Sequence, residues 1–348
     1  MNKILITGGA GFIGFNLLKK ILMNTNYSVI IIDNLVSKSA KYNIKEINRL
    51  FGKYHKRLIF LKFDIGKSFF KELLRLTKDI QLIIHLAAEL NQIKAVNNPL
   101  KIFRTNVIGT LNILEISKKF SSPIIFSSSI KVYSDWLNEL EIREKGERYF
   151  YLKIKCINEN FILDKNSRSR GIYGLTKYLG EQMCQEYHNL FNIPIIINRK
   201  STIYGPYQHG TSGYGWLWHF MESAIKNNTI NIFGNGKQVR DPLFINDLTD
   251  LYLRQIEFLL DKSNSKIFEV YNIGGGYKNS LSLLEAIKYI ECLVGKKIKV
   301  NFLPPRHSDL KIWITDIGKV KSHFNWVPKT NIKRGLKILY NNLNKVAY

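Results

Sequence analysis

The sequence predicts an α/β protein with a doubly wound parallel sheet and a smaller, interleaved α/β substrate-binding domain. Three observations lead to this prediction. Short apolar runs alternate with helical patterns as far as Arg199, as they do in successive βαβ units. A glycine-rich turn, TGGAGFIG, follows the first apolar run and opens a helical pattern. After Thr202 the alternation gives way to YGPYQHGTSGYGW, a glycine- and aromatic-rich stretch typical of a loop over a pocket.

Each predicted element follows from the length of an apolar pattern and from the residues that bound it. Short apolar runs between turn signals are typical of strands, and longer patterns with a period near 3.6 are typical of helices. Strands are predicted at Lys3–Thr7, Tyr27–Asp33, Leu58–Asp64, Gln81–Ala87, Ser122–Ser128 and Pro194–Arg199. Helices are predicted at Phe12–Met23, Ser68–Thr77, Pro99–Lys119 and Tyr173–Phe191, and the strand Phe268–Gly274 is expected to return to the sheet.

Two domains are expected, and their segments alternate along the chain. The chain has 348 residues, of which 45% are hydrophobic, so it can bury a core of this size. We expect residues 1–203 and 238–275 to form the dinucleotide-binding domain. Residues 204–237 and 276–348 are expected to form the domain that binds the substrate.

Composition narrows the classes of protein that fit. No apolar stretch reaches the roughly 18 residues that a membrane span needs, and the apolar run at the N-terminus is too short for a secretory signal. We therefore expect a cytoplasmic protein that does not bind a membrane. The three cysteines, Cys156, Cys184 and Cys292, lack the spacing of a metal site, so no metal is expected.

The formal net charge of +25 could indicate a nucleic-acid partner. The basic residues, however, are scattered through every segment and form no block of like charges. We attribute the positive charge to the general amino-acid composition that the source genome encodes, and we expect no nucleic-acid partner. A second interpretation of the positive charge is that it attracts a small anionic substrate.

The glycine turn predicts a dinucleotide site. Gly8, Gly11 and Gly14 are spaced G-x-x-G-x-x-G between a predicted strand and a predicted helix, the context of a Rossmann-type fold. Such glycines let the backbone approach a pyrophosphate at the start of a helix. The second predicted strand ends at Asp33, where a carboxylate would accept a ribose 2′-hydroxyl and repel a 2′-phosphate. NAD is therefore the expected cofactor.

A second motif predicts acid–base chemistry. Tyr173 and Lys177 form Y-x-x-x-K, and residues four apart share one face of a helix. An ammonium group nearby stabilises a phenolate, which lets a tyrosine act as a base closer to neutral pH. Ser127–Ser129 end a predicted strand, at the edge where open parallel sheets present groups to ligands. A serine hydroxyl there could hold a substrate oxygen while the tyrosine removes its proton.

Taken in order, these motifs resemble the extended short-chain dehydrogenase/reductase family, and within it the nucleotide-sugar epimerases. The resemblance covers nearly the whole chain. The stretches that carry it are TGGAGFIG, Asp33, HLAAE (85–89), TNVIGT (105–110), FSSSIKVYS (126–134), YGLTK (173–177), RKSTIYGP (199–206), GNGKQVRD (234–241) and RHSD (306–309).

The resemblance implies a role for individual residues. The catalytic hydroxyl would be Ser129, with Tyr173 as base and Lys177 as its activator. A nucleotide sugar, a CDP-sugar above all, would be the substrate. The positions that would bind the cofactor are Gly8, Gly11, Phe12, Ile13, Gly14, Asp33, Asn34, Ser37, Asp64, Ile65, Leu86, Ala87, Ala88 and Asn106, together with Tyr173 and Lys177. The positions that would bind the substrate are Ser129, Thr202, Arg240, Arg306 and Asp309.

The chain departs from the family pattern near the expected sugar pocket. The 4,6-dehydratases carry an Asp-Glu pair after the catalytic Thr or Ser, and here Ile130 and Lys131 stand in its place. Without that acid and base, elimination of water should fail, which leaves oxidation and re-reduction of the sugar. Further departures are at Ile172, Thr202 and Ser134, and they bear on the identity of the sugar.

The expected activity is therefore epimerisation of a hexose hydroxyl, in the first place at C2. A 4-epimerase or a decarboxylase on the same scaffold remains an alternative. A non-catalytic sensor or nucleic-acid-binding protein with the same fold is another. The patterns at 99–119 and 173–191 resemble the pair of helices through which the family forms dimers, so a homodimer or homotetramer is expected.

Overall fold

The structure is a computed structural model that describes residues 2–67, 70–76, 79–90, 96–165 and 168–346. The chain forms two compact units. The first comprises Met1–Ser129, Leu175–Arg199 and Thr249–Tyr271, and the second comprises Ile130–Gly174, Lys200–Leu248 and Asn272–Tyr348.

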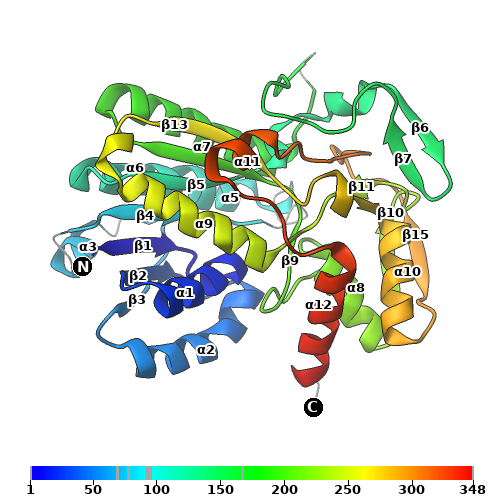
Figure 1. The fold of residues 1–348 in the computed structure, drawn as a ribbon, viewed down its shortest axis with the longest axis horizontal. Coiled ribbons are helices and arrows are strands. Elements are labelled where there is room, and N and C mark those ends of the chain that lie inside the picture. The colour runs from blue at the N-terminus through cyan, green and yellow to red at the C-terminus, as the bar shows by residue number, and fades with distance from the viewer. Residues whose placement is uncertain (1, 68–69, 77–78, 91–95, 166–167, 347–348) are drawn as a thin grey trace. The chain divides into compact units, whose positions relative to one another are not determined.

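A seven-stranded sheet forms the centre of the first unit and confirms the predicted doubly wound fold (Figure 1). Strand β1 lies between β2 and β4, and both neighbours run parallel to it. The chain therefore winds outward in both directions from β1, as in a dinucleotide-binding sheet. The order across the sheet is β13 (Phe268–Ile273), β8 (Ile195–Lys200), β5 (Ile124–Ser129), β4 (Leu82–His85), β1 (Lys3–Thr7), β2 (Ser28–Asp33) and β3 (Leu58–Lys62).

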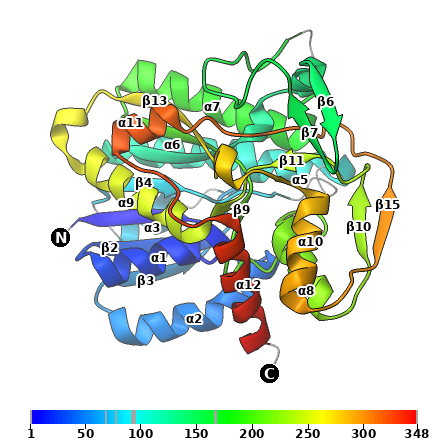
Figure 2. The ribbon, with the colours of Figure 1, turned by 45° about the vertical axis from the view of Figure 1, so that its right-hand side comes forward.

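Helices cover both faces of this sheet, so the inner strands are apolar on both sides. Figures 1 and 2 show α1 (Phe12–Asn24) and α2 (Lys38–Tyr54) on one side and α6 (Gly109–Phe120) and α7 (Gly171–Phe191) on the other. Buried side chains of the strands, namely Leu5, Ile83, Phe126 and Ile195, pack against α6 and α7, and Leu114 of α6 belongs to the same cluster. The remaining helices associated with this unit are α3 (Phe70–Leu76), α5 (Pro99–Phe103) and α9 (Ile245–Leu260).

One helix prediction for this unit is wrong. The pattern at 99–119 is not one α-helix, because a π-helical turn at Arg104–Ile108 separates α5 from α6. The wide turn contains Asn106, whose amide oxygen accepts a hydrogen bond from the Glu89 N–H at 2.8 Å. Helix α2 was not predicted; it starts where the Ser37 hydroxyl accepts a hydrogen bond from the Ala40 N–H. Within the pattern at 68–77, residues 68, 69 and 77 lie outside the described residues.

The second unit is built from short paired strands and, among its described residues, four α-helices that lie wholly within it. The pairs are β6 (Ile142–Lys145) with β7 (Arg148–Tyr151), β9 (Ile203–Tyr204) with β12 (Leu243–Phe244), β10 (Ile230–Phe233) with β15 (Val300–Leu303), and β11 (Val239–Arg240) with β14 (Leu281–Ser282). The helices are α8 (Trp216–Ile225), α10 (Leu283–Val294), α11 (Gly318–Phe324) and α12 (Ile332–Val346).

Helix α10 has well-defined ends. The Ser282 hydroxyl and the Glu285 carboxylate form a capping box at its start, and Gly295 ends it in the left-handed conformation. The β6–β7 hairpin lies beside it, since Arg148 of β7 pairs with Glu285 of α10 at 3.4 Å. The hairpin was not predicted from the sequence.

In the described part of the chain, no helix combines the length and the apolar character needed to cross a membrane. Among the same residues, no group of three or more His, Cys, Asp or Glu side chains could hold a metal ion.

Candidate active site

The glycine turn has the shape that a pyrophosphate needs. Gly8 adopts a φ of +71°, and a Cβ atom there would lie 2.9 Å from the Ala87 backbone, so only glycine fits without strain. Gly11 is the N-cap of α1 and makes no side-chain cap. The first backbone N–H groups of the helix, around Phe12 and Ile13, are therefore left without a side-chain acceptor. These features fit the phosphates of NAD.

Asp33 lies beside this turn, at the end of β2. Its carboxylate accepts hydrogen bonds from the Ala10 N–H at 3.1 Å and from the Leu35 N–H at 2.8 Å. Burial raises the pKa of this carboxyl group, and the backbone N–H groups act in the opposite direction. The hydrogen bonds fix the carboxylate next to the glycine turn, where a ribose hydroxyl is expected.

The other predicted cofactor residues fall into two groups. The first group lies near Asp33. The Asn34 amide is 3.3 Å from the Asp64 carboxylate, and Ser37 caps the start of α2. Gly14 lies in the first turn of α1. Leu86 and Ala87 leave β4 beside the turn, where both backbone N–H groups bond to Thr7; Ala88, Ile65 and Asn106 complete the set in this unit.

His85 is the first residue of the HLAAE motif, and the sequence predicts no role for it. Its ring bonds to the Thr7 hydroxyl at 2.7 Å and to the Thr110 hydroxyl at 3.0 Å, and it is fully buried. Burial, together with the nearby charge of Lys177, lowers the pKa of His85 to about 3. The ring is therefore neutral at physiological pH, and it fixes the ends of β1 and β4 rather than transferring protons.

Lys177 is buried on α7, one helical turn after Tyr173. Its ammonium group donates a hydrogen bond to the Ser127 carbonyl at 2.8 Å and lies 5.0 Å from the centre of the Phe126 ring. Burial lowers the pKa of Lys177 to about 8, while Cys184 and Glu181 act in the opposite direction. The side chain therefore still carries a charge at pH 7, close to the end of β5.

The structure distinguishes the three serines of β5. Ser128 donates a hydrogen bond to Glu181, which forms a buried ion pair with Arg199 at 2.7 Å. Ser127 lies on the opposite face, where Tyr252 is its side-chain partner. Ser129 is the last residue of the strand. Sequence reasoning missed the Glu181–Arg199 pair, because nothing in the motifs links these two positions.

In the second unit, the start of α7 packs tightly against the turn that follows β5. A Cβ atom on Gly174 would lie 2.2 Å from the Lys131 carbonyl oxygen. Any larger residue would push the start of the helix, which carries Tyr173, away from this turn. The glycine of YGLTK is thus a packing requirement that the spacing of the motif alone did not explain.

A cluster of charges in the second unit brings together three predicted residues. Asp309 accepts hydrogen bonds from Lys131 at 3.0 Å and from Arg240 at 2.8 Å. Burial would raise the pKa of Asp309, but the charges of Lys131, Arg240 and Arg306 outweigh it and hold the pKa well below its usual range. The Arg306 guanidinium lies 3.9 Å from the centre of the Phe233 ring. Lys131, noted from the sequence only as a departure, is thus the partner of Asp309.

Thr202 has a different neighbour. Its hydroxyl accepts a long hydrogen bond of 3.4 Å from the Trp216 indole N–H, at the start of α8. The structure thus places Thr202 against the loop-and-helix segment after residue 204.

The fold and the glycine turn define a dinucleotide-binding α/β protein. The chain belongs to the NAD dependent epimerase/dehydratase family, whose model matches residues 4–274. It is 34% identical to CDP-paratose 2-epimerase of Salmonella typhi over 97% of this chain and 98% of that protein. It is 31% identical to a putative UDP-glucose 4-epimerase of Methanocaldococcus jannaschii, with 97% of each chain covered.

A solved structure agrees with these sequence relatives. UDP-glucuronic acid 4-epimerase from Bacillus cereus, as a Y149F mutant in complex with NAD and UDP-4-deoxy-4-fluoro-glucuronic acid, is similar with a TM-score of 0.82 and 28% identity. The match covers 99% of both chains. The chain is accordingly an NAD-dependent nucleotide-sugar epimerase by family, fold and cofactor.

The buried charge of Lys177 predicts a pH-dependent stability. Its pKa is about 8 in the folded chain and near 10.5 when unfolded, so between these values the unfolded state binds more protons and stability rises with pH. Relative to Lys177→Met, the wild type should gain roughly 2–3 kcal/mol in free energy of unfolding from pH 7 to pH 10. Urea denaturation of both proteins across this range measures the difference. A difference that does not change with pH would contradict the burial argument.

Proposed function

We propose that the chain is a 2-epimerase of a CDP-hexose, similar in activity to CDP-paratose 2-epimerase. The observation that carries this proposal is the ion pair between Lys131 and Asp309. In the family that the sequence resembles, the 4,6-dehydratases have an acidic residue at the position of Lys131. It is held by a carboxylate, so it can serve as neither the acid nor the base of a water elimination. The full-length similarity to CDP-paratose 2-epimerase supports the same assignment.

Bound NAD supplies the chemistry that accepts a hydride from the sugar ring and returns it to the other face. Tyr173 takes the proton of the reacting hydroxyl. Lys177 carries the charge that stabilises the tyrosine phenolate, and its ammonium also holds the Ser127 carbonyl at the end of β5. Ser129, the last residue of β5, binds the substrate oxygen. His85 takes no part because it is neutral and buried.

The charge cluster of the second unit suits a sugar nucleotide. Lys131, Arg240 and Arg306 are cations around the single carboxylate of Asp309, which leaves a net charge of +2 for the diphosphate of the substrate. Arginine also binds phosphate oxygens in a bidentate manner. We propose that Arg240 and Arg306 bind the diphosphate, Asp309 the nucleotide ribose, and Thr202 the sugar. Of these residues, Arg306 and Asp309 lie in the substrate-binding segments proposed from the sequence, 204–237 and 276–348, whereas Thr202 and Arg240 lie outside them.

A screen of sugar nucleotides tests this proposal. We expect the purified protein to interconvert CDP-paratose and CDP-tyvelose, with little turnover of UDP-glucose, and to form no 4-keto-6-deoxy product from CDP-glucose or dTDP-glucose. Proton NMR of each reaction identifies the inverted carbon and any keto product. A 4-keto-6-deoxy product would contradict the account of Ile130 and Lys131.

The same screen evaluates the second candidate, a 4-epimerase. That candidate is favoured by the similarity to a putative UDP-glucose 4-epimerase. Inversion of a UDP-hexose at C4, without inversion of a CDP-hexose at C2, would replace the proposed activity with this one. The family and the cofactor would remain the same.

We further propose that the chain assembles as a homodimer or homotetramer through α5, α6 and α7. Large apolar side chains on these helices are exposed, namely Leu100, Leu111 and Leu175. Such side chains mark a protein–protein contact when they are contiguous. Sedimentation analysis measures the mass of the assembly, and a monomer at micromolar concentration would contradict this proposal.

A further inference from the structure

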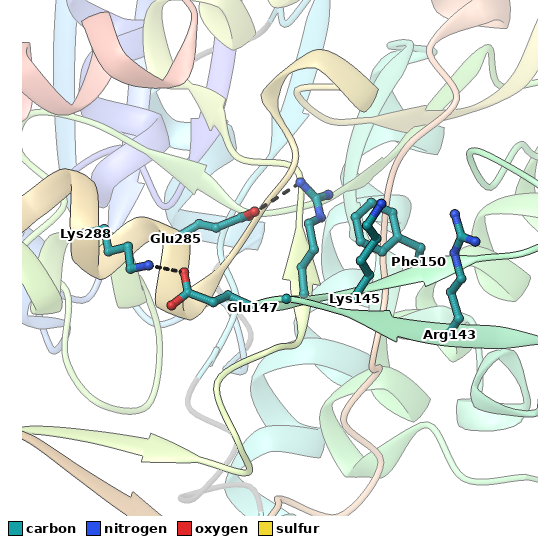
Figure 3. A pocket seen from close by; sticks show the side chains of 8 residues that line it. Arg143, Lys145, Glu147, Phe150, Glu285 and Lys288 are labelled. Atoms are coloured by element: carbon teal, nitrogen blue, oxygen red, sulfur yellow. Dashed lines mark hydrogen bonds and ion pairs between the residues drawn. The ribbon is translucent and has the colours of Figure 1, made fainter.

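A hollow on the second unit lies outside the proposed active site. It has a volume of about 680 Å³ and lies between the β6–β7 hairpin and the first turns of α10 (Figure 3). None of the residues that line it belongs to the Lys131–Arg240–Asp309 cluster. The main lining side chains are Arg143, Lys145, Arg148 and Phe150 of the hairpin and Glu285 and Lys288 of α10.

Strand pairing gathers three cations and one ring on a single face of the hairpin. Arg143 is paired with Phe150, and Lys145 is paired with Arg148. Paired residues of an antiparallel hairpin point to the same face, and so do residues two apart along a strand. Figure 3 shows Arg143 and Lys145 extending to the same side of the hairpin, close to Phe150. The Arg148 guanidinium lies 5.0 Å from the centre of the Phe150 ring.

The acids of the hollow do not balance these cations. Glu285 pairs with Arg148 at 3.4 Å, and Glu147 pairs with Lys288 at 2.6 Å. Arg143 and Lys145 have no carboxylate partner among the residues that the structure describes. Two further features point to a missing anion. Lys145 and Arg148 are like charges directly opposite each other, which weakens a hairpin, and the buried Arg148 Nε–H has no hydrogen-bond acceptor.

We propose that this hollow is a second anion site, which binds the phosphate groups of a nucleotide and stacks its base on Phe150. Arginine and lysine side chains suit phosphate oxygens, and an aromatic ring between cations suits a planar base. The volume lies in the range of small-ligand sites. A nucleoside diphosphate fits both the surplus charge and the ring.

Equilibrium dialysis of the NAD-loaded protein with labelled CDP tests the site. We expect two CDP molecules per wild-type chain, one at the proposed active site and one at the hollow. Arg143→Gln combined with Lys145→Gln should reduce this number to one. Both side chains are exposed, so the variant is expected to fold and to keep its epimerase activity. Lys153→Gln with Lys155→Gln is the matched control, because it removes two exposed lysines of the same unit outside the hollow, and it should keep two sites.

Phe150→Leu distinguishes a nucleotide from a bare phosphate. It should weaken CDP binding at the hollow roughly fivefold or more, since a stacked base is lost, and it should leave binding of inorganic pyrophosphate unchanged. An equal loss for CDP and pyrophosphate would overturn the nucleotide assignment. The same number of CDP sites in the wild type and in the Arg143/Lys145 variant, or an equal loss in the Lys153/Lys155 control, would overturn the site itself. None of these outcomes depends on which sugar nucleotide is the substrate.

Discussion

Replacement of Tyr173 by phenylalanine is expected to lower turnover by about 10²–10⁴, the usual contribution of a general base. The change removes only the phenol oxygen. Tyr173 lies in the first turn of α7, one turn before the buried cation of Lys177, so its hydroxyl is the proposed acceptor of the substrate proton. The cofactor-binding features around Gly8 and Asp33 lie on other elements. Turnover should therefore fall while NAD stays bound.

The measurement is the turnover of the variant, together with the amount of NAD released on denaturation. Tyr178→Phe is the control, because it removes the same atom from a residue further along the same helix. It should keep most of the activity. A loss below tenfold for Tyr173→Phe would mean that another group is the base. Loss of bound NAD would mean that the phenol supports the cofactor instead.

The buried Glu181–Arg199 pair predicts the largest effect on stability. Only 3% of the Glu181 side chain and 9% of the Arg199 side chain are exposed, and the carboxylate also accepts the Ser128 hydroxyl. Glu181→Leu would leave the buried guanidinium without a counter-ion, which typically costs about 3–5 kcal/mol. The free energy of unfolding in urea should fall by this amount.

Two further variants separate the charge effect from simple loss of contacts. Arg199→Met added to Glu181→Leu removes the uncompensated charge and should recover a large part of the lost stability. Glu46→Gln breaks an exposed pair with Arg49 on α2 and should cost less than about 1 kcal/mol. If Glu181→Leu and Glu46→Gln lower the free energy of unfolding by the same amount, the buried pair does not contribute more to stability than an exposed pair, which contradicts the prediction.

The sheet was predictable because its signals are local. Each inner strand is an apolar run of strand length, and the glycine turn follows directly from β1. Helix α2 lacked such a signal, because its buried face comprises only Ser39, Ala40, Asn43 and Ile47. The β6–β7 hairpin lacked one as well: its turn is highly charged, and Arg148 finds its partner Glu285 only in α10, 137 residues further along the chain.

The candidate site also has a part that the sequence predicts and a part that it does not. The glycine turn, Asp33 and the Tyr173–Lys177 spacing could be found because each is a short motif with a known physical purpose. The partner of Lys131 could not, since Asp309 lies 178 residues away, and a sequence does not state which carboxylate neutralises which cation. The serines illustrate the same limit. The sequence does not show that Ser128 contacts Glu181 or that Ser127 contacts Tyr252.

The central claim is that one hydrogen leaves the ring carbon and returns to it without meeting the solvent. Turnover of the substrate in heavy water tests this claim most directly, with NMR or mass analysis of the inverted carbon. The account predicts a product without deuterium there, because no opposed pair of bases is found among the described site residues and Tyr173 handles only the hydroxyl proton. Deuterium at the inverted carbon would contradict the account and would indicate proton abstraction beside a carbonyl group.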